Sequence, residues 1–505
     1  MNKKALTLAV ILSMATTGAF ASNVVSTSIN NSDKLSKHQK EAIMLTQKQL
    51  AEKAVQDVQT YEKALTLNES STINLALANN RTAKQSMWDY EVAKANVSVA
   101  AAAKNPSLAY GWSGTRTHID SSSSSRNAAI AAAGGGTGSS TSKSGSHALT
   151  LSVPVFSPAD DANIRGMRYS REGTGAAYEE ALQQAKYDAV NGYYILIMNR
   201  NLVDVANQSV KDYQGHVDNV RAQYNVGLVA NSDVLAANTN LAESQTTLVQ
   251  RKNTADLSEA NLNNIIGYPV QTSIHTVEQT LQYKPYNVTL EQSKAYAMLH
   301  RSALVQSAMA VKQAEQSVKQ AKAGYLPTVS ANVNRRHADS DGYFGSDDKS
   351  WAIGATATWS LWNGGQTQNQ IKVAEANLEK AKEANLAVVD SVNLAVQQAY
   401  LNLRSAEQTI ASTQTAVEQG QENFRIATLR YRAGVGTNLD VLDAETTLTT
   451  ARNNYVQALY NYNVSIAALE QATGVPLETP VGGGASVIAN SGAEAELAAL
   501  TTTVN

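Results

Sequence analysis

The amino-acid sequence predicts an α+β membrane protein in which long antiparallel coiled-coil helices are combined with four short β-strands per chain. Three observations lead to this fold class. The N-terminus has the pattern of an export signal, the chain contains two copies of one structural repeat, and each copy carries segments with the apolar alternation of membrane strands. Together they predict a tall, thin-walled molecule without a compact core.

The first residues have the features of a secretory signal peptide. Lys3 and Lys4 form a short basic start, Ala5 to Ala15 is an almost unbroken apolar run, and Ala19-Phe-Ala21 is a small-x-small cleavage site. Residues 1–21 are therefore expected to be absent from the mature protein. No later segment reaches about 18 unbroken apolar residues, so we expect no transmembrane helix and a mature chain that is soluble, peripheral or a membrane β-barrel.

The composition excludes several classes of protein. The chain has 41 basic and 43 acidic residues, so it lacks the basic excess of a nucleic-acid-binding protein. It has no cysteine, which excludes disulfides and thiolate metal sites. The histidines form neither an HExxH motif nor an i, i+4 pair, and no GxSxG or Walker motif is present. We therefore expect no cofactor, no metal site, no nucleic-acid partner and no enzymatic activity.

An internal repeat organises the chain into residues 70–270 and 289–476. The segment from Tyr224 to Leu235 matches the segment from Tyr431 to Leu442 at a constant offset of 207 residues. Each copy is predicted to contain a first helix, two strands, a very long helix, a tight turn and a return helix.

Apolar spacing predicts the helices. Tyr187, Val190, Tyr194 and Ile197 follow steps of three and four residues, which is typical of a coiled-coil seam. The predicted helices are first helices near 70–104 and 289–323, long helices at 158–226 and 364–432, and return helices at 232–266 and 439–472. A helix of about 69 residues is roughly 100 Å long, which equals two helices of about 35 residues stacked end to end.

Four segments alternate apolar and polar residues with a period of two. In one of them Trp351, Ile353 and Ala355 alternate with small or polar residues. The predicted strands cover residues 107–118, 147–156, 327–337 and 350–361. A half-buried soluble sheet shows the same period and is the alternative interpretation. Because single-chain membrane barrels start at about eight strands and open edges are not tolerated in lipid, four strands predict a barrel shared by three copies, with 12 strands.

The remaining segments lie outside the repeat pattern. Residues 22–69 are predicted to form an N-terminal extension that is helical from Asp33 to Leu65, residues 271–288 a linker, and residues 477–505 a flexible tail. Residues 121–146 form an insertion in the first copy. Its glycine run at 134–138 lacks the lysine of a phosphate-binding loop, so we expect a surface loop there.

Paired sequence motifs carry a resemblance to a known family. Tyr-x-x-Gly turns at Tyr224 and Tyr431 are each followed by Asp-Val-Leu, Tyr325-Leu-Pro-Thr enters a strand, and Leu361-Trp-Asn-Gly-Gly leaves one. Residues 70–476 thereby resemble the TolC-type outer-membrane channels. The resemblance implies a homotrimer with a 12-stranded β-barrel in outer-membrane lipid and a 12-helix α-barrel through the periplasm. It also implies that a periplasmic adaptor protein and an inner-membrane transporter dock at the lower tips.

The two turns between long and return helices are the predicted adaptor-docking tips. The tip residues are Asn225, Val226, Gly227, Leu228, Ala433, Gly434 and Val435. The alternative interpretation is a plain helix-hairpin turn, because Gly at these positions readily adopts the left-handed conformation that ends a helix.

The resemblance also implies contacts that close the tips. The matching positions are Asp233 and Tyr431, so we expect the Tyr431 hydroxyl to hydrogen-bond the Asp233 carboxylate. Relatives carry an arginine five residues after this tyrosine, where this chain has Gly436. Arg432 is the candidate substitute.

Asp440 and Asp443 match a paired acidic ring in the family. In a trimer they would form two rings of three carboxylates at the narrow periplasmic entrance, and rings of Asp select for cations. The alternative is that these acids stabilise the N-terminus of the return helix, where a carboxylate interacts favourably with the helix dipole.

The predicted function is a passive exit duct for efflux or type I secretion, located in the outer membrane and extending into the periplasm. The alternative is a periplasmic coiled-coil adaptor, or a structural or adhesin protein. Surface exposure of the 121–146 loop distinguishes these possibilities, because a periplasmic adaptor would be protected from protease added to whole cells.

Overall fold

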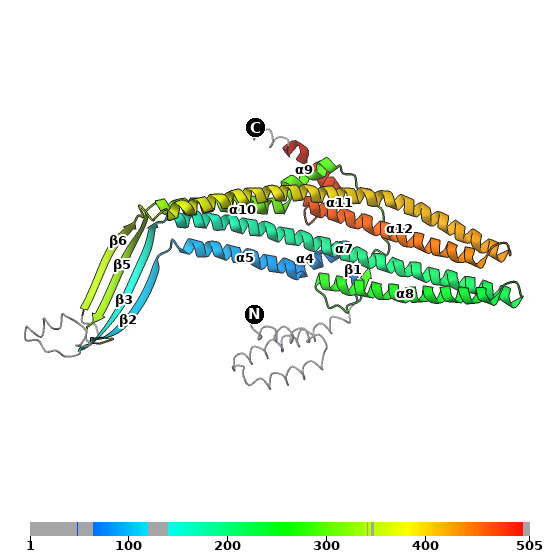
Figure 1. The fold of residues 1–505 in the computed structure, drawn as a ribbon, viewed down its shortest axis with the longest axis horizontal. Helices are drawn as coiled ribbons and strands as arrows, with labels where there is room; N and C mark the ends of the chain where they lie inside the picture. Colours follow the sequence, from blue (N-terminus) through cyan, green and yellow to red (C-terminus); the bar gives the residue numbers. More distant parts are fainter. Residues whose placement is uncertain (1–47, 49–63, 120–139, 341, 345–347, 498–505) are drawn as a thin grey trace, which may run out of the picture.

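The computed structural model describes residues 48, 64–119, 140–340, 342–344 and 348–497. The predicted signal peptide, nearly all of the predicted N-terminal extension and the glycine run at 134–138 lie outside these residues. The described part is elongated, with a bundle of long helices that continues at one end into a four-stranded sheet (Figure 1).

Two very long helices run along the bundle, α7 (Pro158–Asn225) and α11 (Gln366–Arg432). Helix α7 begins with Pro158 in its first turn. A backbone N–H at this position has no partner within the helix, so the missing N–H of proline costs no hydrogen bond. Asp160 and Asp161 follow in the same turn, where carboxylates are stabilised by the helix dipole. At about 1.5 Å per residue, each long helix extends roughly 100 Å.

Shorter helices flank the long ones in two levels (Figure 1). Near the sheet lie α5 (Arg81–Ala102) and α10 (Ser302–Lys322), which ends in the short 3-10 helix η1 (Ala323–Tyr325). At the opposite end lie the return helices α8 (Asn231–Ile266) and α12 (Asn438–Thr473). Two further helices, α4 (Glu69–Asn79) and α9 (Leu290–His300), lie between the levels.

The continuous first helices predicted near 70–104 and 289–323 are each divided in two. Asn80 has ψ 125° and its side chain caps α5 by accepting a hydrogen bond from the Ala83 N–H at 3.0 Å. Arg301 has ψ 119°, and its guanidinium pairs with Glu180 of α7 at 2.6 Å. These breaks reorient the chain midway along the bundle, which the apolar period alone did not predict.

The sheet consists of β2 (Ser107–Ile119), β3 (Ser140–Phe156), β5 (Thr328–Asp339) and β6 (Asp348–Thr358). The strand order is β2-β3-β5-β6 and every neighbouring pair is antiparallel. Strand β3 is longer than predicted, because residues 140–146 of the expected insertion loop extend it. The outer strands β2 and β6 each have one edge without a strand partner in the described sheet.

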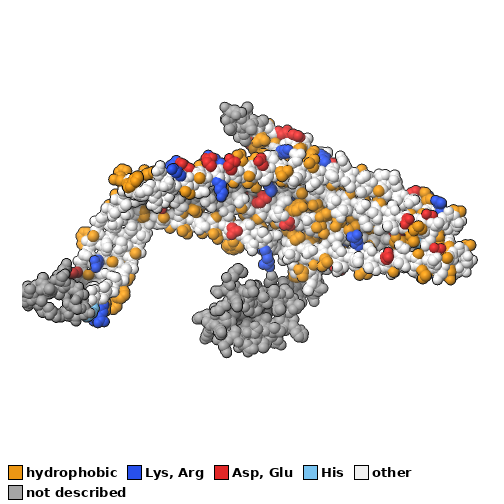
Figure 2. Space-filling model, viewed as in Figure 1, with side chains coloured by type: hydrophobic (Ala, Val, Ile, Leu, Met, Phe, Trp, Pro, Cys, Tyr) orange, Lys and Arg blue, Asp and Glu red, His pale blue; other side chains and the backbone are white. Residues whose placement is uncertain are grey.

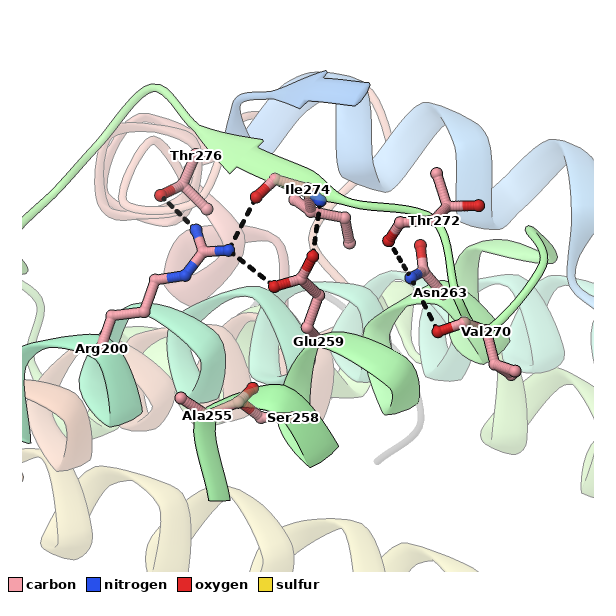
Figure 3. A network of polar contacts seen from close by, with 9 residues as sticks. All are labelled: Arg200, Ala255, Ser258, Glu259, Asn263, Val270, Thr272, Ile274 and Thr276. Carbon is pink, nitrogen blue, oxygen red and sulfur yellow. Dashed lines mark hydrogen bonds and ion pairs between the residues drawn. The ribbon is translucent and has the colours of Figure 1, made fainter. Parts of the chain in front are cut away.

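A small parallel sheet in the middle of the bundle corrects two predictions. Strand β1 (Leu65–Leu67), predicted as the end of a helical extension, pairs with β4 (Ile274–Thr276), which lies in the predicted linker. Arg200 of α7 binds β4 through the Ile274 carbonyl at 2.7 Å and pairs with Glu259 of α8 at 2.9 Å. The Glu259 carboxylate accepts the Ile274 N–H in return, at 2.7 Å (Figure 3). This network fixes the linker against both helices.

The C-terminal segment is packed and partly helical up to residue 497, in contrast to the predicted flexible tail. It contains α13 (Gly484–Asn490), whose Ile488 is buried. The buried Glu470 carboxylate on α12 accepts the backbone N–H groups of Gly482 and Gly484, each at 2.9 Å. Lys186 of α7 donates to the Thr479 carbonyl at 2.7 Å. Two buried ionisable side chains therefore hold this segment in place.

Among the described residues, the hydrophobic core is divided into three clusters along the bundle instead of one central core. Two lie at mid-length, around Tyr462 with Leu403 and around Tyr193 with Leu262. The third surrounds Val217 and Val441 near the helix tips. Within the described part of the chain, no helix is long and apolar enough to cross a membrane.

Candidate functional site at the helix tips

The first tip is a tight turn between α7 and α8. Gly227 has φ +79°, a left-handed conformation that favours glycine. Its N–H donates to the Tyr224 carbonyl at 2.9 Å, and the Leu228 N–H donates to the Gln223 carbonyl at 2.9 Å. These bonds satisfy carbonyls that the end of α7 would otherwise leave unpaired.

The second tip, between α11 and α12, is built in the same way. Gly434 has φ +73°, and its N–H donates to the Tyr431 carbonyl at 3.0 Å. The next helix starts with a capping box, in which the Asp440 N–H donates to the Thr437 hydroxyl at 3.1 Å. The Thr437 N–H donates to the Asp440 carboxylate at 2.9 Å.

The predicted docking residues present apolar side chains to solvent. Val226 is 71% exposed, Leu228 74% and Val435 68%, and Asn225, Gly227, Ala433 and Gly434 are also exposed. Exposed apolar side chains on both neighbouring turns form a surface suited to contact with another protein.

Polar contacts join the two hairpins just behind the tips. The His216 Nε2 lies 2.6 Å from the Asn438 Oδ1, and the Asn438 amide donates to the Asp233 carbonyl at 3.4 Å. Gln223 donates to the Tyr431 carbonyl at 3.2 Å. Burial lowers the pKa of His216, although its hydrogen bond with Asn438 acts in the opposite direction. All four helices are therefore linked here.

Sequence reasoning did not assign His216, Asn438 or Gln223 to this site. His216 adjoins the apolar seam of α7, next to Val217, and its ring packs against Tyr431 with centroids 5.1 Å apart. The position of His216 beside this seam could have indicated its role, because a histidine at a buried face requires a polar partner on a facing helix.

Tyr431 is 3% exposed, and none of the described residues forms a hydrogen bond with its hydroxyl. The expected bond to Asp233 is therefore not made within one protomer. Burial raises the pKa of Tyr431, and the charge of Asp233 raises it further.

Arg432 does not form an ion pair with Asp233 within the described protomer. Arg432 is exposed and forms no ion pair with any described residue. At Gly436, an added Cβ would lie 3.1 Å from the Tyr431 backbone nitrogen, so a larger residue would require the turn to shift. The turn of this chain therefore favours glycine at this position.

The two acids of the predicted ring have different surroundings. Asp440 is committed to the helix cap, and the Thr437 backbone N–H holds the pKa of its carboxyl below the usual value. The Thr437 hydroxyl and the charge of Arg430 act in the same direction. Asp443 lies one turn further along α12 and is exposed. Asp440 therefore takes part in the cap of α12, while its carboxylate stays at the surface.

A polar cavity of about 230 Å³ lies behind the tips, between α7, α8 and α12. Its wall includes the buried Glu445, which accepts hydrogen bonds from Ser209 at 2.6 Å and Thr449 at 2.8 Å. Among the described residues, no group of three or more His, Cys, Asp or Glu is placed to hold a metal ion. The chemistry of this region is hydrogen bonding and charge.

Comparison with known proteins identifies the family. The model of the outer membrane efflux protein family matches residues 72–268 and 296–475. Outer membrane protein TolC of Salmonella enteritidis is 25% identical over 348 residues, which cover 65% of this chain and 69% of that protein.

Solved structures show the same fold. A membrane protein from Pseudomonas aeruginosa superposes with a TM-score of 0.70 at 16% identity, covering 80% of this chain and 93% of the other. The outer membrane protein VceC from Vibrio cholerae superposes with a TM-score of 0.68 at 20% identity, covering 81% and 97%. The family match spans both repeated halves and the helices that form the tips. The chain therefore belongs to the outer membrane efflux protein family and is located in the outer membrane.

Proposed function

We propose that the chain is one third of a homotrimeric channel that provides a passive exit duct for efflux or type I secretion. The observation that carries this proposal is the four-stranded antiparallel sheet with two open edges. Because β2 and β6 run in opposite directions, β6 of one copy can pair with β2 of the next in antiparallel fashion. Three copies then close a 12-stranded barrel without a free edge.

Exposed apolar side chains on the helices support the same assembly. Helix α5 exposes Trp88 and Val99, and α11 exposes Leu386, Leu394 and Leu401, each more than half exposed. A stable monomer rarely leaves so many large apolar side chains in water along two helices. In a trimer these faces would pack between protomers and form a periplasmic α-barrel.

The tips are the proposed contact with the rest of a transport system. Their exposed valine and leucine side chains suit docking of a periplasmic adaptor protein, and the Asp440 and Asp443 carboxylates would surround the entrance. An inner-membrane transporter would supply the energy, so the channel itself performs no chemistry. This assignment rests on the family and on the tip surface.

Channel recordings and cell-surface protease mapping test the proposal together. The purified chain should be a trimer by light scattering and should form cation-selective pores in planar bilayers. Trypsin added to whole cells should cut the segment that joins β2 to β3, which contains Arg126. A monomer without conductance, protected from trypsin in intact cells, would instead support a periplasmic adaptor.

A further inference from the structure

The two faces of the sheet differ strongly in polarity. Residues that lie directly opposite one another across the strands include Leu108 and Leu151, then Val333 and Ile353, all on one face. The other face carries Ser, Thr, Asn and Gly in the corresponding positions. In a barrel the first face would contact lipid and the second would line the lumen.

Towards the free end of the sheet, the same lipid-side face becomes basic. Arg116 lies opposite Lys143, Arg335 lies opposite Leu149 and Trp351, and Lys349 lies opposite His337. We call Arg116, Lys143, Arg335 and Lys349 the basic girdle. All four are exposed (Figure 2 shows Lys and Arg at this end of the sheet). None of them forms an ion pair with a described residue.

Negative charge on this face is scarce among the described strand residues. The carboxylate there belongs to Asp339, which accepts the Gly342 N–H at 2.9 Å. Asp348 lies opposite Ala338 and therefore on the lumen-side face. The girdle thus contributes four positive charges per protomer, and three protomers would bring twelve to this end of the barrel.

Aromatic side chains share the rows of Arg335 and Lys349, whereas Arg116 and Lys143 lie further towards the free end. Tyr110 and Trp351 are exposed, and the Trp112 ring stacks on Phe344 with centroids 5.4 Å apart and planes 6° apart. The Trp112 Nε1 donates to the Tyr343 carbonyl at 3.1 Å. Tryptophan and tyrosine concentrate where a membrane meets water, so these residues mark the outer boundary of the lipid contact.

We propose that the basic girdle binds the phosphate groups of an anionic lipid in the outer leaflet. A positive side chain on the lipid face destabilises a barrel by about 2–4 kcal/mol at the midplane but much less near the interface, where it can meet a headgroup. The girdle begins at the aromatic rows and continues beyond them towards the free end of the sheet, away from the apolar rows. A phosphorylated lipid supplies both the apolar chains and the negative charge that this surface fits. The inference rests on the proposed trimeric barrel.

Arg336 provides a matched control for this surface. It is adjacent to Arg335 in sequence but lies opposite Ala148 and Ser350, on the lumen-side face. Both arginines are exposed and on the same strand. A lipid that binds the outside of the barrel should therefore respond to Arg335 and ignore Arg336.

Native mass spectrometry of the full-length protein in detergent tests the proposal. Bisphosphorylated lipid A, the same lipid without its phosphates, and inorganic phosphate serve as separate probes. We expect the parent and Arg336→Gln to bind the phosphorylated lipid equally. Two double variants, Arg335→Gln/Lys349→Gln and Arg116→Gln/Lys143→Gln, should bind the phosphorylated lipid more weakly than the parent. We expect a loss of roughly fivefold for each charge removed. High salt should weaken the interaction in the parent.

Several results would overturn the proposal. Equal binding of the dephosphorylated lipid, unchanged binding in both double variants, or equal loss in Arg336→Gln would each contradict it. Binding of inorganic phosphate as tightly as the lipid would indicate a plain anion site. The same spectra report the oligomeric state. A trimer whose lipid binding ignores the girdle contradicts this inference alone, whereas a monomer contradicts the proposed channel as well.

Discussion

Replacing Glu470 by glutamine is expected to make the stability of the protein less dependent on pH. Glu470 is 3% exposed, and one of its carboxylate oxygens accepts the Gly482 and Gly484 N–H groups. Burial raises the pKa of this carboxyl from 4.5 to about 7, against the opposing effects of these hydrogen bonds and of Lys186. The folded protein therefore favours the protonated form.

The sign of the effect follows from proton linkage. Between pH 4.5 and about 7 the native state binds more protons at Glu470 than the unfolded chain does, so the free energy of unfolding falls as pH rises through this range. At about 1.4 kcal/mol per pKa unit, this pKa difference lowers the free energy of unfolding by about 3 kcal/mol above pH 7. Glutamine can accept both N–H groups without a charge. The higher stability of the glutamine variant above pH 7 will be partly offset, because Lys186 loses a nearby negative charge.

Thermal unfolding of parent and variant at pH 5 and pH 8 measures the effect. We expect the variant to unfold at the same temperature as the parent at pH 5 and at a clearly higher temperature at pH 8. Glu478→Gln is the matched control, since Glu478 is exposed in the same segment and should give no pH-dependent difference. A constant difference at both pH values, or a variant less stable at pH 8, would refute the reasoning.

Three further predictions concern the tips and the C-terminal segment. Tyr431→Phe removes the buried hydroxyl and is expected to raise resting conductance in planar bilayers; unchanged conductance would mean that another contact holds the tips closed. The double change of Asp440 and Asp443 to alanine should abolish block by a trivalent cation on the periplasmic side, and block as strong as in the parent would exclude the acidic ring. Gly484→Ala places a Cβ about 2.6 Å from the Glu470 Oε1, so limited proteolysis should detect a released C-terminal segment, and an unchanged digest would contradict the packing argument.

The helical architecture and the family were predictable because their signals are long. Seams such as Tyr213, Val217 and Val220 repeat over many turns, and only a helix brings such spacings to one face. The Tyr-x-x-Gly turns likewise place glycine where the chain adopts positive φ, at Gly227 and Gly434. Both features are set by local geometry and can be recognised in a single sequence.

The elements in the middle of the molecule depend on contacts that are distant in sequence. Strands β1 and β4 have three residues each, too few for a period, and they form because each pairs with the other and Arg200 binds β4. The fold of the C-terminal segment depends on Glu470 and Lys186, whose partners are backbone atoms with no sequence signature.

The site was predictable at the level of the turns but not of their partners. Glycine and exposed apolar residues located the tips, while the link from His216 to Asn438 joins residues 222 positions apart. The tyrosine–aspartate bond was expected from the family, yet the Tyr431 hydroxyl has no bond within the described protomer. A contact between protomers is the remaining arrangement for such a lock, and the conductance of Tyr431→Phe tests it.

Disulfide trapping of the open sheet edges tests the central claim, that three copies share one barrel. The chain has no native cysteine, so Ala109→Cys on β2 can be combined in turn with Ser350→Cys, Ala352→Cys or Gly354→Cys on β6, all on the lumen-side face. A disulfide requires Cβ atoms about 3.5–4.5 Å apart, so only strands paired across the junction will react. We expect covalent trimers in outer-membrane fractions for at least one pairing, visible on non-reducing gels. Monomers throughout the scan, from protein that reaches the outer membrane, would contradict it.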